Sequence, residues 1–562
     1  MDAIKVFALG GLDENGRNCY VVEINHDIIV LDCGTSLPDK NIPGVDFLLP
    51  NFSYLIKNKE RIIGYVLTHG HDENMSALKY FYKQAPAPIY CTRTTKMTFI
   101  NQALSQGIDV KGIDFIEVIP SQSFNIGNHM VHLFQTCHNA SYSFGIAIET
   151  TLGNIVYTGD YIVEYDKANP AYKFDLKGLC RIAEQPTLLL MSESKMAGVP
   201  GYCSPKHRVT PLIERYFKEE KKKIFISCYW QNYFRIHEIT KLCRENHKKI
   251  YFYNEYTRKT MEYLMSADKD LIDPTIIIPK DELLRVKSDE AVVLILGNDA
   301  DIFDEMTLLA RGLNDDKLIS LDSNCIFIHA ALPRNILETA STRAIDEIYK
   351  TGCEVIWVKG KDIQAMHAQQ EDIRLFLTLL KPRYYLPVRG TFSNMIDNAK
   401  LAINSGIGLN HSSVFILDNG MQLNVSKEGF ATVKTAEEAN IETQAILVDG
   451  KGISSISEEA INQRIRLGLD GVVIVAATIS EKEGRVIAGP DCQMRGFVYV
   501  KEAEPVLKFV TNTFLEEINF AFNTNNLDWE KVKKNTIDRC TKFIKKENGR
   551  EPLVIPTIII KD

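Results

Sequence analysis

The sequence has little of several features that would define a function at once. It contains no run of roughly 18 uninterrupted apolar residues, which argues against a membrane-spanning helix. Its start, MDAIKVFALGG, lacks the basic residues and the small-residue cleavage site of a signal peptide, so we expect a cytoplasmic protein. The twelve cysteines include no CxxC pair, which favours reduced thiols over a disulfide framework. Basic residues (65) are fewer than acidic ones (72), so an RNA partner would need a locally basic groove.

What is present over the 562 residues is an ordinary globular composition, with 45% hydrophobic and 24% charged residues. The first third alternates buried strand patterns with short helical ones, and polar residues follow the strands. From about Pro211, further strand–helix units predict a second α/β domain with a parallel sheet. After a short polar segment, Thr435–Asn440, the pattern changes to a compact α+β domain.

Histidine is scarce, with 12 residues in the chain, so its placement is informative. His69 and His71 are one residue apart in VLTHGHDEN, directly after the strand pattern Ile62–Leu67. His138 and Asp160 also follow strand patterns, in QTCHNAS and IVYTGD. Three imidazoles and a carboxylate can hold one Zn²⁺ in tetrahedral geometry. An HxH pair alone is more often two surface or hydrogen-bonded histidines than a metal site, so the specific signal is the ordered series of all four residues.

This series resembles the motifs of the ribonuclease J family, metallo-β-lactamase-fold nucleases of the β-CASP group. IIVLDCG, with Asp32 as an orienting carboxylate, resembles the first motif, and VLTHGHDENMSAL the second, HxHxDH. LLLMSES, QAMHAQQEDIRLFL and KPRYYLPVRG resemble the three later β-CASP motifs, and ILVDGKGI, GPDCQMRGFVYV and GREPLVIPTIII the C-terminal domain. The resemblance implies an α/β fold: a metallo-β-lactamase αββα sandwich with an inserted α/β β-CASP domain and a small α+β C-terminal domain. The expected boundaries are the sandwich at 1–208 and 373–432, the β-CASP domain at 209–372, a linker at 433–442 and the C-terminal domain at 443–562.

The resemblance also implies site residues, and several of them depart from the family pattern. The metal ligands of the first site would be His69, His71, His138 and Asp160. The catalytic positions would be Glu73, Asp160 and His367, with Glu193 supporting them. The second-metal positions carry Glu73, Asn74 and Arg389, where the family has aspartate and two histidines. Asparagine is a poor metal ligand, and the permanent charge of arginine repels a cation. We therefore expect at most one Zn²⁺ per chain, with Mn²⁺ or Mg²⁺ as alternatives.

The residues expected to bind RNA are also partly changed. The family holds the terminal RNA phosphate with a Ser-Gly-His loop, where this chain has Ala365, Met366 and His367. Methionine cannot donate to a phosphate, and its bulk opposes the close backbone approach that glycine allows. Asn232 and Arg235, in SCYWQNYFRI, resemble the family's asparagine and arginine in the substrate wall. The sequence therefore predicts RNA contacts from Asn232, Arg235 and His367.

Three hypotheses about function remain open from the sequence. The favoured one is a weakly active or inactive ribonuclease J family protein in RNA processing and decay, acting as the RNA-binding partner subunit of an active homologue. The second is an active metal-dependent 5′–3′ exoribonuclease or endoribonuclease. The third is a scaffold that no longer binds RNA. The resemblance further implies a homodimer, or a hetero-oligomer with an active homologue, assembled through the C-terminal domain, without membrane contact.

Overall fold

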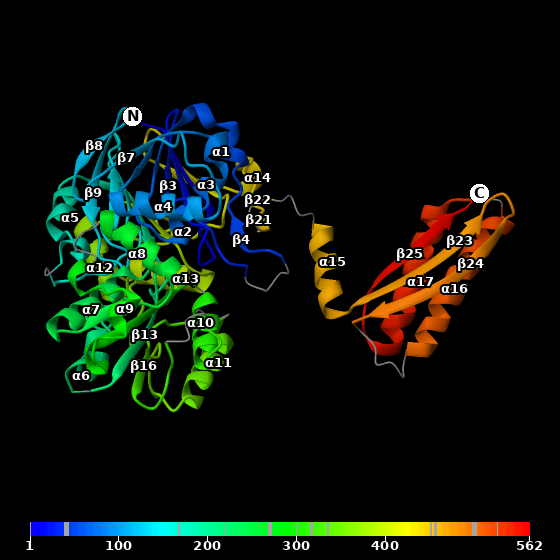
Figure 1. Cartoon of the computed structure of the whole chain (residues 1–562). Coiled ribbons are helices and arrows are strands. Elements are labelled where there is room, and N and C mark those ends of the chain that lie inside the picture. The colour runs from blue at the N-terminus through cyan, green and yellow to red at the C-terminus, as the bar shows by residue number, and fades with distance from the viewer. Residues whose placement is uncertain are drawn as a thin grey trace. The chain divides into compact units, whose positions relative to one another are not determined.

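The computed structural model describes residues 2–38, 44–166, 169–219, 221–267, 272–298, 300–314, 319–333, 337–449, 452–453, 458–496, 503–524 and 526–561 (Figure 1). The chain divides into two compact units: Met1–Leu37 with Phe47–Ile446, and Pro38–Asp46 with Leu447–Asp562. Within these described ranges, no helix combines the length and apolar character needed to cross a membrane.

Two sheets form a sandwich in the first unit. The eight-stranded sheet has, in order, β20 (Ala431–Lys434), β19 (Gln422–Val425), β1 (Ile4–Gly10), β2 (Cys19–Ile24), β3 (Asp27–Leu31), β5 (Ile62–Val66), β6 (Ile89–Cys91) and β7 (Phe115–Glu117). The six-stranded sheet has β18 (Tyr384–Val388), β12 (Thr187–Glu193), β11 (Asn154–Tyr157), β10 (Phe144–Ile148), β9 (His129–Gln135) and β8 (Ser123–Ile126). Apolar side chains of both sheets share one core, in which Val22, Leu31, Ile146 and Leu189 are fully buried.

Helices cover the sandwich, and three of them begin within three residues of His71, His367 and Arg389. They are α1 (Ser53–Lys57), α2 (Asp72–Met75), α3 (Leu78–Phe81), α4 (Arg93–Ser105), α5 (Leu176–Ala183), α12 (Gln370–Leu380), α13 (Phe392–Ile403) and α14 (Ala436–Ala439), with a short strand β4 (Phe47–Leu49). Capping boxes fix the starts of α12, at Gln369, and of α13, at Thr391. These caps therefore hold the backbone just after His367 and Arg389.

The third sheet of this unit is parallel and belongs to the segment inserted between β12 and α12, green in Figure 1. Its order is β14 (Lys249–Phe252), β15 (Ala291–Gly297), β13 (Lys223–Tyr229), β16 (Cys325–His329) and β17 (Glu354–Trp357). The flanking helices are α6 (Thr210–Glu219), α7 (Tyr233–Glu245), α8 (Glu255–Ala267), α9 (Lys280–Leu283), α10 (Asp301–Ala310) and α11 (Glu338–Lys350). The central strands are continuous apolar runs because helices bury both faces of the sheet.

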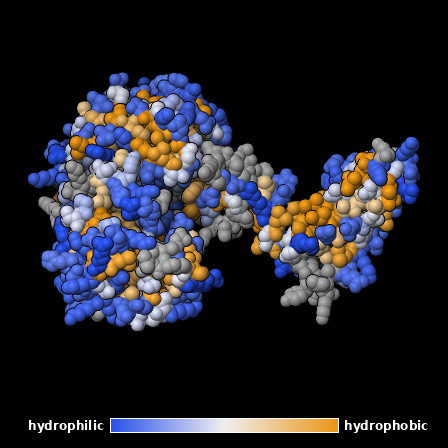
Figure 2. Space-filling view, in the orientation of Figure 1, coloured by the Kyte–Doolittle hydropathy of each residue, from blue (hydrophilic) through white to orange (hydrophobic). Residues whose placement is uncertain are grey.

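The second unit contains a three-stranded sheet with one covered face. Its elements are β21 (Ile446–Asp449), β22 (Gly452–Ile453), α15 (Glu458–Leu469), β23 (Val472–Ser480), β24 (Arg485–Arg495), α16 (Ala503–Asn523), α17 (Trp529–Asn548) and β25 (Leu553–Ile560). Val473 and Val475 pack with Val510 and Ile544 of the two long helices. Ile474 pairs with Ile555 on the opposite face, where both are exposed. Figure 2 shows apolar residues gathered over part of this unit.

The architecture agrees with the predicted fold class: a two-sheet sandwich covered by helices, an inserted α/β domain with a parallel sheet, and an α+β domain in the second unit. The segment expected to be a linker, 433–442, contains the end of β20 and helix α14. The two compact units meet in sequence at Ile446 and Leu447.

Candidate metal centre

The four predicted first-site ligands lie at the ends of sandwich strands. His69 and His71 follow β5, in the turn that leads into α2, while His138 follows β9 and Asp160 follows β11. All four side chains are buried. The structure thus brings together residues that are up to 91 positions apart, counting from His69 to Asp160.

The ring nitrogens of the histidines meet at one point. His69 Nε2 lies 3.1 Å from His71 Nδ1, and His138 Nε2 lies 3.3 Å from the same atom. Asp160 Oδ2 lies 3.8 Å from His69 Nε2 and 3.7 Å from His138 Nε2. Two nitrogens that bind one tetrahedral Zn²⁺ at its usual bond length are separated by about 3.3 Å. The spacing of the imidazole nitrogens therefore matches that of ligands to one ion.

Hydrogen bonds determine which ring nitrogens carry protons. Backbone carbonyls accept only, so His71 Nε2–H donates to Gln231 O (3.3 Å) and His138 Nδ1–H to Met366 O (2.7 Å). His69 Nδ1 lies 3.0 Å from the Thr68 hydroxyl, whose proton goes to a carboxylate oxygen of Asp32 (2.9 Å), so His69 Nδ1 is the donor.

The nitrogens that face one another, His69 Nε2, His71 Nδ1 and His138 Nε2, consequently carry lone pairs and no protons. Burial lowers the pKa of His69, His71 and His138, which keeps the three rings neutral. Three lone pairs within hydrogen-bond distance repel one another unless a cation lies between them. A metal-bound histidine characteristically donates its other N–H to an oxygen, as all three do here.

Asp160 completes the fit. Its Oδ2 atom is buried and accepts no hydrogen bond, although it lies beside His69 and His138. A buried carboxylate oxygen without a donor is costly unless a ligand satisfies it. His69, His71, His138 and Asp160 therefore fit a divalent metal ion, which would polarise a bound water molecule when present.

Arg389 lies on the other side of the Asp160 carboxylate. Its Nε donates to Asp160 Oδ1, and its Nη2 donates to Glu73 Oε1 at 3.1 Å. The side chain is 1% exposed. Burial opposes its charge, but the Asp160 and Glu73 carboxylates outweigh this effect and raise the pKa of Arg389. A permanent cation thus bridges two of the carboxylates that the family resemblance assigns to the metal and catalytic positions.

Asn74 does not face the histidine cluster. Its Nδ2 donates to Asp32 Oδ2 at 2.8 Å, and Tyr157 donates to the same oxygen at 2.7 Å. Burial raises the pKa of Asp32 to about 6, against the lowering effect of its hydrogen bonds. Asn74 therefore supports the Asp32–Thr68–His69 chain instead of supplying a metal ligand.

His367 has both ring nitrogens engaged by charged residues. Its Nδ1 lies 2.8 Å from Glu193 Oε2, and its Nε2 lies 3.1 Å from Lys195 Nζ. The other Glu193 oxygen accepts from the backbone N–H of Tyr161 and Ala368. His367 Nδ1 also lies 3.8 Å from Asp160 Oδ2, so His367 itself borders the metal cluster, while the predicted supporting residue, Glu193, holds its ring.

The other predicted RNA residues have local partners, in a segment whose Gln231 carbonyl oxygen accepts from His71 of the cluster. Asn232 Oδ1 accepts from the backbone N–H of Arg235 and so caps α7. The Arg235 side chain is buried and donates to Ala330 O at 2.6 Å. Met366 is buried in the core, while its carbonyl oxygen orients His138.

Sequence reasoning missed Thr68, Lys195 and Gln231. Thr68 directly precedes His69, and Lys195 stands two positions after Glu193. This proximity to a motif residue was the available signal. Gln231 acts through its backbone carbonyl, which leaves no trace in the residue type.

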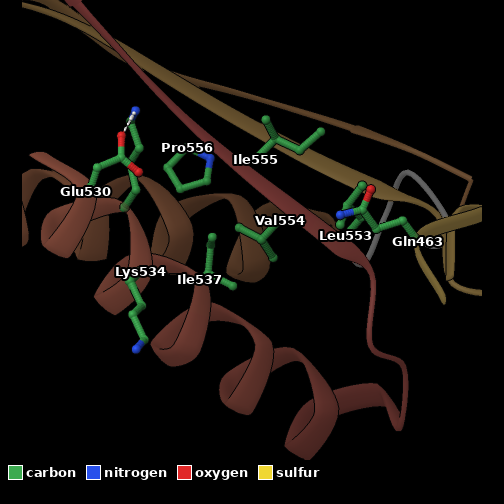
Figure 3. A pocket seen from close by; sticks show the side chains of 9 residues that line it. Gln463, Glu530, Lys534, Ile537, Leu553, Val554, Ile555 and Pro556 are labelled. Carbon is green, nitrogen blue, oxygen red and sulfur yellow. Dashed lines mark hydrogen bonds and ion pairs between the residues drawn. The ribbon is translucent and has the colours of Figure 1, made fainter. Parts of the chain in front are cut away.

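A separate cavity of about 460 Å³ lies in the second unit, between α17 and β25. Figure 3 shows Ile537, Val554 and Pro556 along it. Glu530 and Lys533, which also line the cavity, form an ion pair at 2.8 Å. The lining contains no imidazole or thiol. Among the residues that the structure describes, the groups that could hold a metal ion are His69–His71–His138 and the adjoining His138–Asp160–His367.

The sandwich and its histidine cluster define a metallo-β-lactamase-fold protein. The family model described as "Metallo-beta-lactamase superfamily" matches residues 12–192, and the one described as "Ribonuclease J C-terminal domain" matches residues 459–560. Proteins named Ribonuclease J 2 from Staphylococcus epidermidis and Staphylococcus aureus are 27% and 26% identical over 557 residues, 99% of this chain and 98% of theirs. The resemblance to the ribonuclease J family is therefore confirmed, over the C-terminal domain by the family model and over nearly the whole chain by these relatives.

A solved structure shares the fold alone. A crystal structure of a protein of unknown function from Enterococcus faecalis V583 superposes with a TM-score of 0.52 at 14% identity, covering 75% of this chain and 100% of that one.

Proposed function

We propose that this chain is a ribonuclease J family protein that holds one divalent ion, Zn²⁺ by its ligand set, and hydrolyses RNA weakly or not at all. The observation that carries the proposal is the buried Arg389 guanidinium, which donates to both Asp160 and Glu73. The similarity to proteins named Ribonuclease J 2 supports a role in RNA processing and decay. We also propose a cytoplasmic location.

The chemistry follows from what a guanidinium can and cannot do. In a two-metal site, both ions stabilise the charge that develops on the phosphoryl oxygens, and one lowers the pKa of the attacking water. Arg389 supplies fixed positive charge but has no open coordination position for water. Asn74 is committed to Asp32, so it does not replace the missing histidine. We expect the loss of rate to span orders of magnitude.

RNA binding without turnover suits a partner subunit. We propose that the chain binds RNA beside an active ribonuclease J homologue, or as a homodimer, and that the second unit makes the contact. The support is the open sheet face, where Ile474, Ile555 and Ile559 are exposed on paired strands.

The test restores the ligand set with Glu73→Asp, Asn74→His and Arg389→His together. The triple variant should bind a second metal ion and cleave single-stranded RNA faster than the parent, with Zn²⁺ or Mn²⁺ supplied. Each single variant is a control and should gain little, because groups of one site act as a unit. A parent that already turns over at about 1 per second or faster contradicts the proposal.

An active 5′–3′ exoribonuclease or endoribonuclease is the second candidate. The observation that favours it is the complete first-site cluster together with the His367–Glu193 pair at 2.8 Å. The same assay separates the two candidates, since only this one predicts rapid cleavage by the parent. A scaffold without RNA binding is tested by salt-dependent RNA affinity, which a scaffold lacks.

A further inference from the structure

Two tyrosines on the surface of the first unit stand out by their exposure and pairing. Tyr165 is 64% exposed and Tyr202 is 37% exposed. Their ring centroids lie 6.5 Å apart, with the ring planes at 72°. Other described aromatic side chains are as exposed, such as Tyr349 and Phe430, but these two are in contact with each other.

The loop that carries Tyr202 is fastened to the loop that carries His367. Next to Tyr202, the Cys203 N–H donates to Asp372 Oδ2 at 3.1 Å, and its thiol lies 3.3 Å from Ala365 O. The Gln364 N–H donates to Lys206 O at 3.0 Å in the same loop pair. Tyr202 therefore stands directly before Cys203, the residue that contacts the His367 loop.

The segment that carries Tyr165 begins at Asp160 of the metal centre. Between them, the Val163 N–H donates to Asp372 Oδ1 at 2.9 Å. One carboxylate, that of Asp372, thus ties both tyrosine-bearing segments together. Glu164 adds to this, because it accepts from Ser204 and Arg208 across the two segments.

The pair is pre-organised and uncharged. Hydrogen bonds on both sides fix the backbone, so little freedom is lost on binding. Burial and the neighbouring Tyr165 raise the pKa of Tyr202, which keeps its phenol neutral at pH 7. Arg208, close by, is already paired with Glu164 and Asp166. The surface offers aromatic faces for stacking rather than net positive charge for phosphates.

We propose that Tyr165 and Tyr202 form a stacking platform for nucleobases of single-stranded RNA that enters or leaves the metal centre. The inference rests on the RNA binding in the proposed function, but not on its metal count or lack of activity. Base–aromatic stacking tolerates any sequence, because every base has a π face. It is also nearly independent of salt, unlike phosphate contacts.

The test measures the affinity of the full-length protein for fluorescently labelled single-stranded RNA of about 12 nucleotides by anisotropy, at several salt concentrations. Tyr165→Ser and Tyr202→Ser should each weaken binding by about 5- to 100-fold without changing the salt slope. Tyr165→Phe and Tyr202→Phe keep the ring and should bind within about twofold of the parent. Tyr349→Ser removes a tyrosine on α11 whose exposure, 52%, lies between those of Tyr165 and Tyr202, and it should have no effect.

Several outcomes would overturn the inference. Serine variants that bind RNA like the parent reject the platform and leave the proposed function standing. Serine variants that keep RNA affinity but alter the oligomeric state assign the tyrosines to a protein contact instead. A parent that binds no RNA rejects both the platform and the proposed RNA-binding role. Metal content, measured on each variant, confirms that the adjoining centre is intact.

Discussion

Replacing Arg389 with methionine should destabilise the first unit strongly. The substitution keeps an unbranched chain but removes the cation that donates to Asp160 and Glu73. The Asp160 side chain is fully buried and would keep an uncompensated charge, whereas Glu73 is 20% exposed and would be partly hydrated. Removing one partner of a buried pair costs about 3–5 kcal/mol, and most of that cost should arise at Asp160.

The assay is urea unfolding of the metal-free protein, followed by circular dichroism. Arg374→Met is the matched control, because Arg374 is 46% exposed in its pair with Glu371 and should contribute less than about 1 kcal/mol. Adding Zn²⁺ or Mn²⁺ should then stabilise Arg389→Met more than the parent, since the freed carboxylates attract a cation. If Arg389→Met lowers the free energy of unfolding by as little as Arg374→Met does, the reasoning is refuted.

Three further predictions concern other parts of the chain. His71→Ala should release the bound metal. His132→Ala, which removes a half-buried histidine paired with Glu149, is the control and should keep the metal; the metal content of both variants after dialysis is the measurement. Burial lowers the pKa of His329 to about 3 in the folded protein, whereas the same imidazole in the unfolded chain binds a proton near pH 6.5. The free energy of unfolding should therefore fall as the pH drops below about 6.5. Between pH 6.5 and 5 the parent should lose about 2 kcal/mol more than His329→Gln in urea unfolding, and parallel pH profiles would contradict this. A chain that ends at Asn440 should lose its self-association or its partner in sedimentation analysis; an unchanged oligomeric state would reject assembly through the second unit.

The fold and the family resemblance were predictable because their signals are local. Each strand pattern stands directly before its functional residue, as in the run that precedes His69, and the motifs occur in a fixed order along the chain. Side chains at strand ends in one sandwich meet at a common edge, so the approximate position of the cluster followed from the pattern.

The hydrogen-bond partners were not predictable in the same way. The donation by Arg389 to Glu73 joins residues 316 positions apart, and the sequence could only place a charge near the second-metal position. Likewise, Asn74 could have faced the cluster or Asp32, and only the direction of its side chain in α2 decides between them. Asn232 caps α7 through a local hydrogen bond, a role that its resemblance to the family's substrate wall did not indicate, and its RNA contact stays a prediction.

Metal analysis of the purified, dialysed full-length protein tests the central claim most directly. Arg389 bonded to Asp160 and Glu73, beside an intact His69–His71–His138 cluster, predicts a stoichiometry of about one divalent ion per chain or less. Two tightly held ions per chain would contradict the account, because the buried guanidinium and a second cation cannot share the same carboxylates.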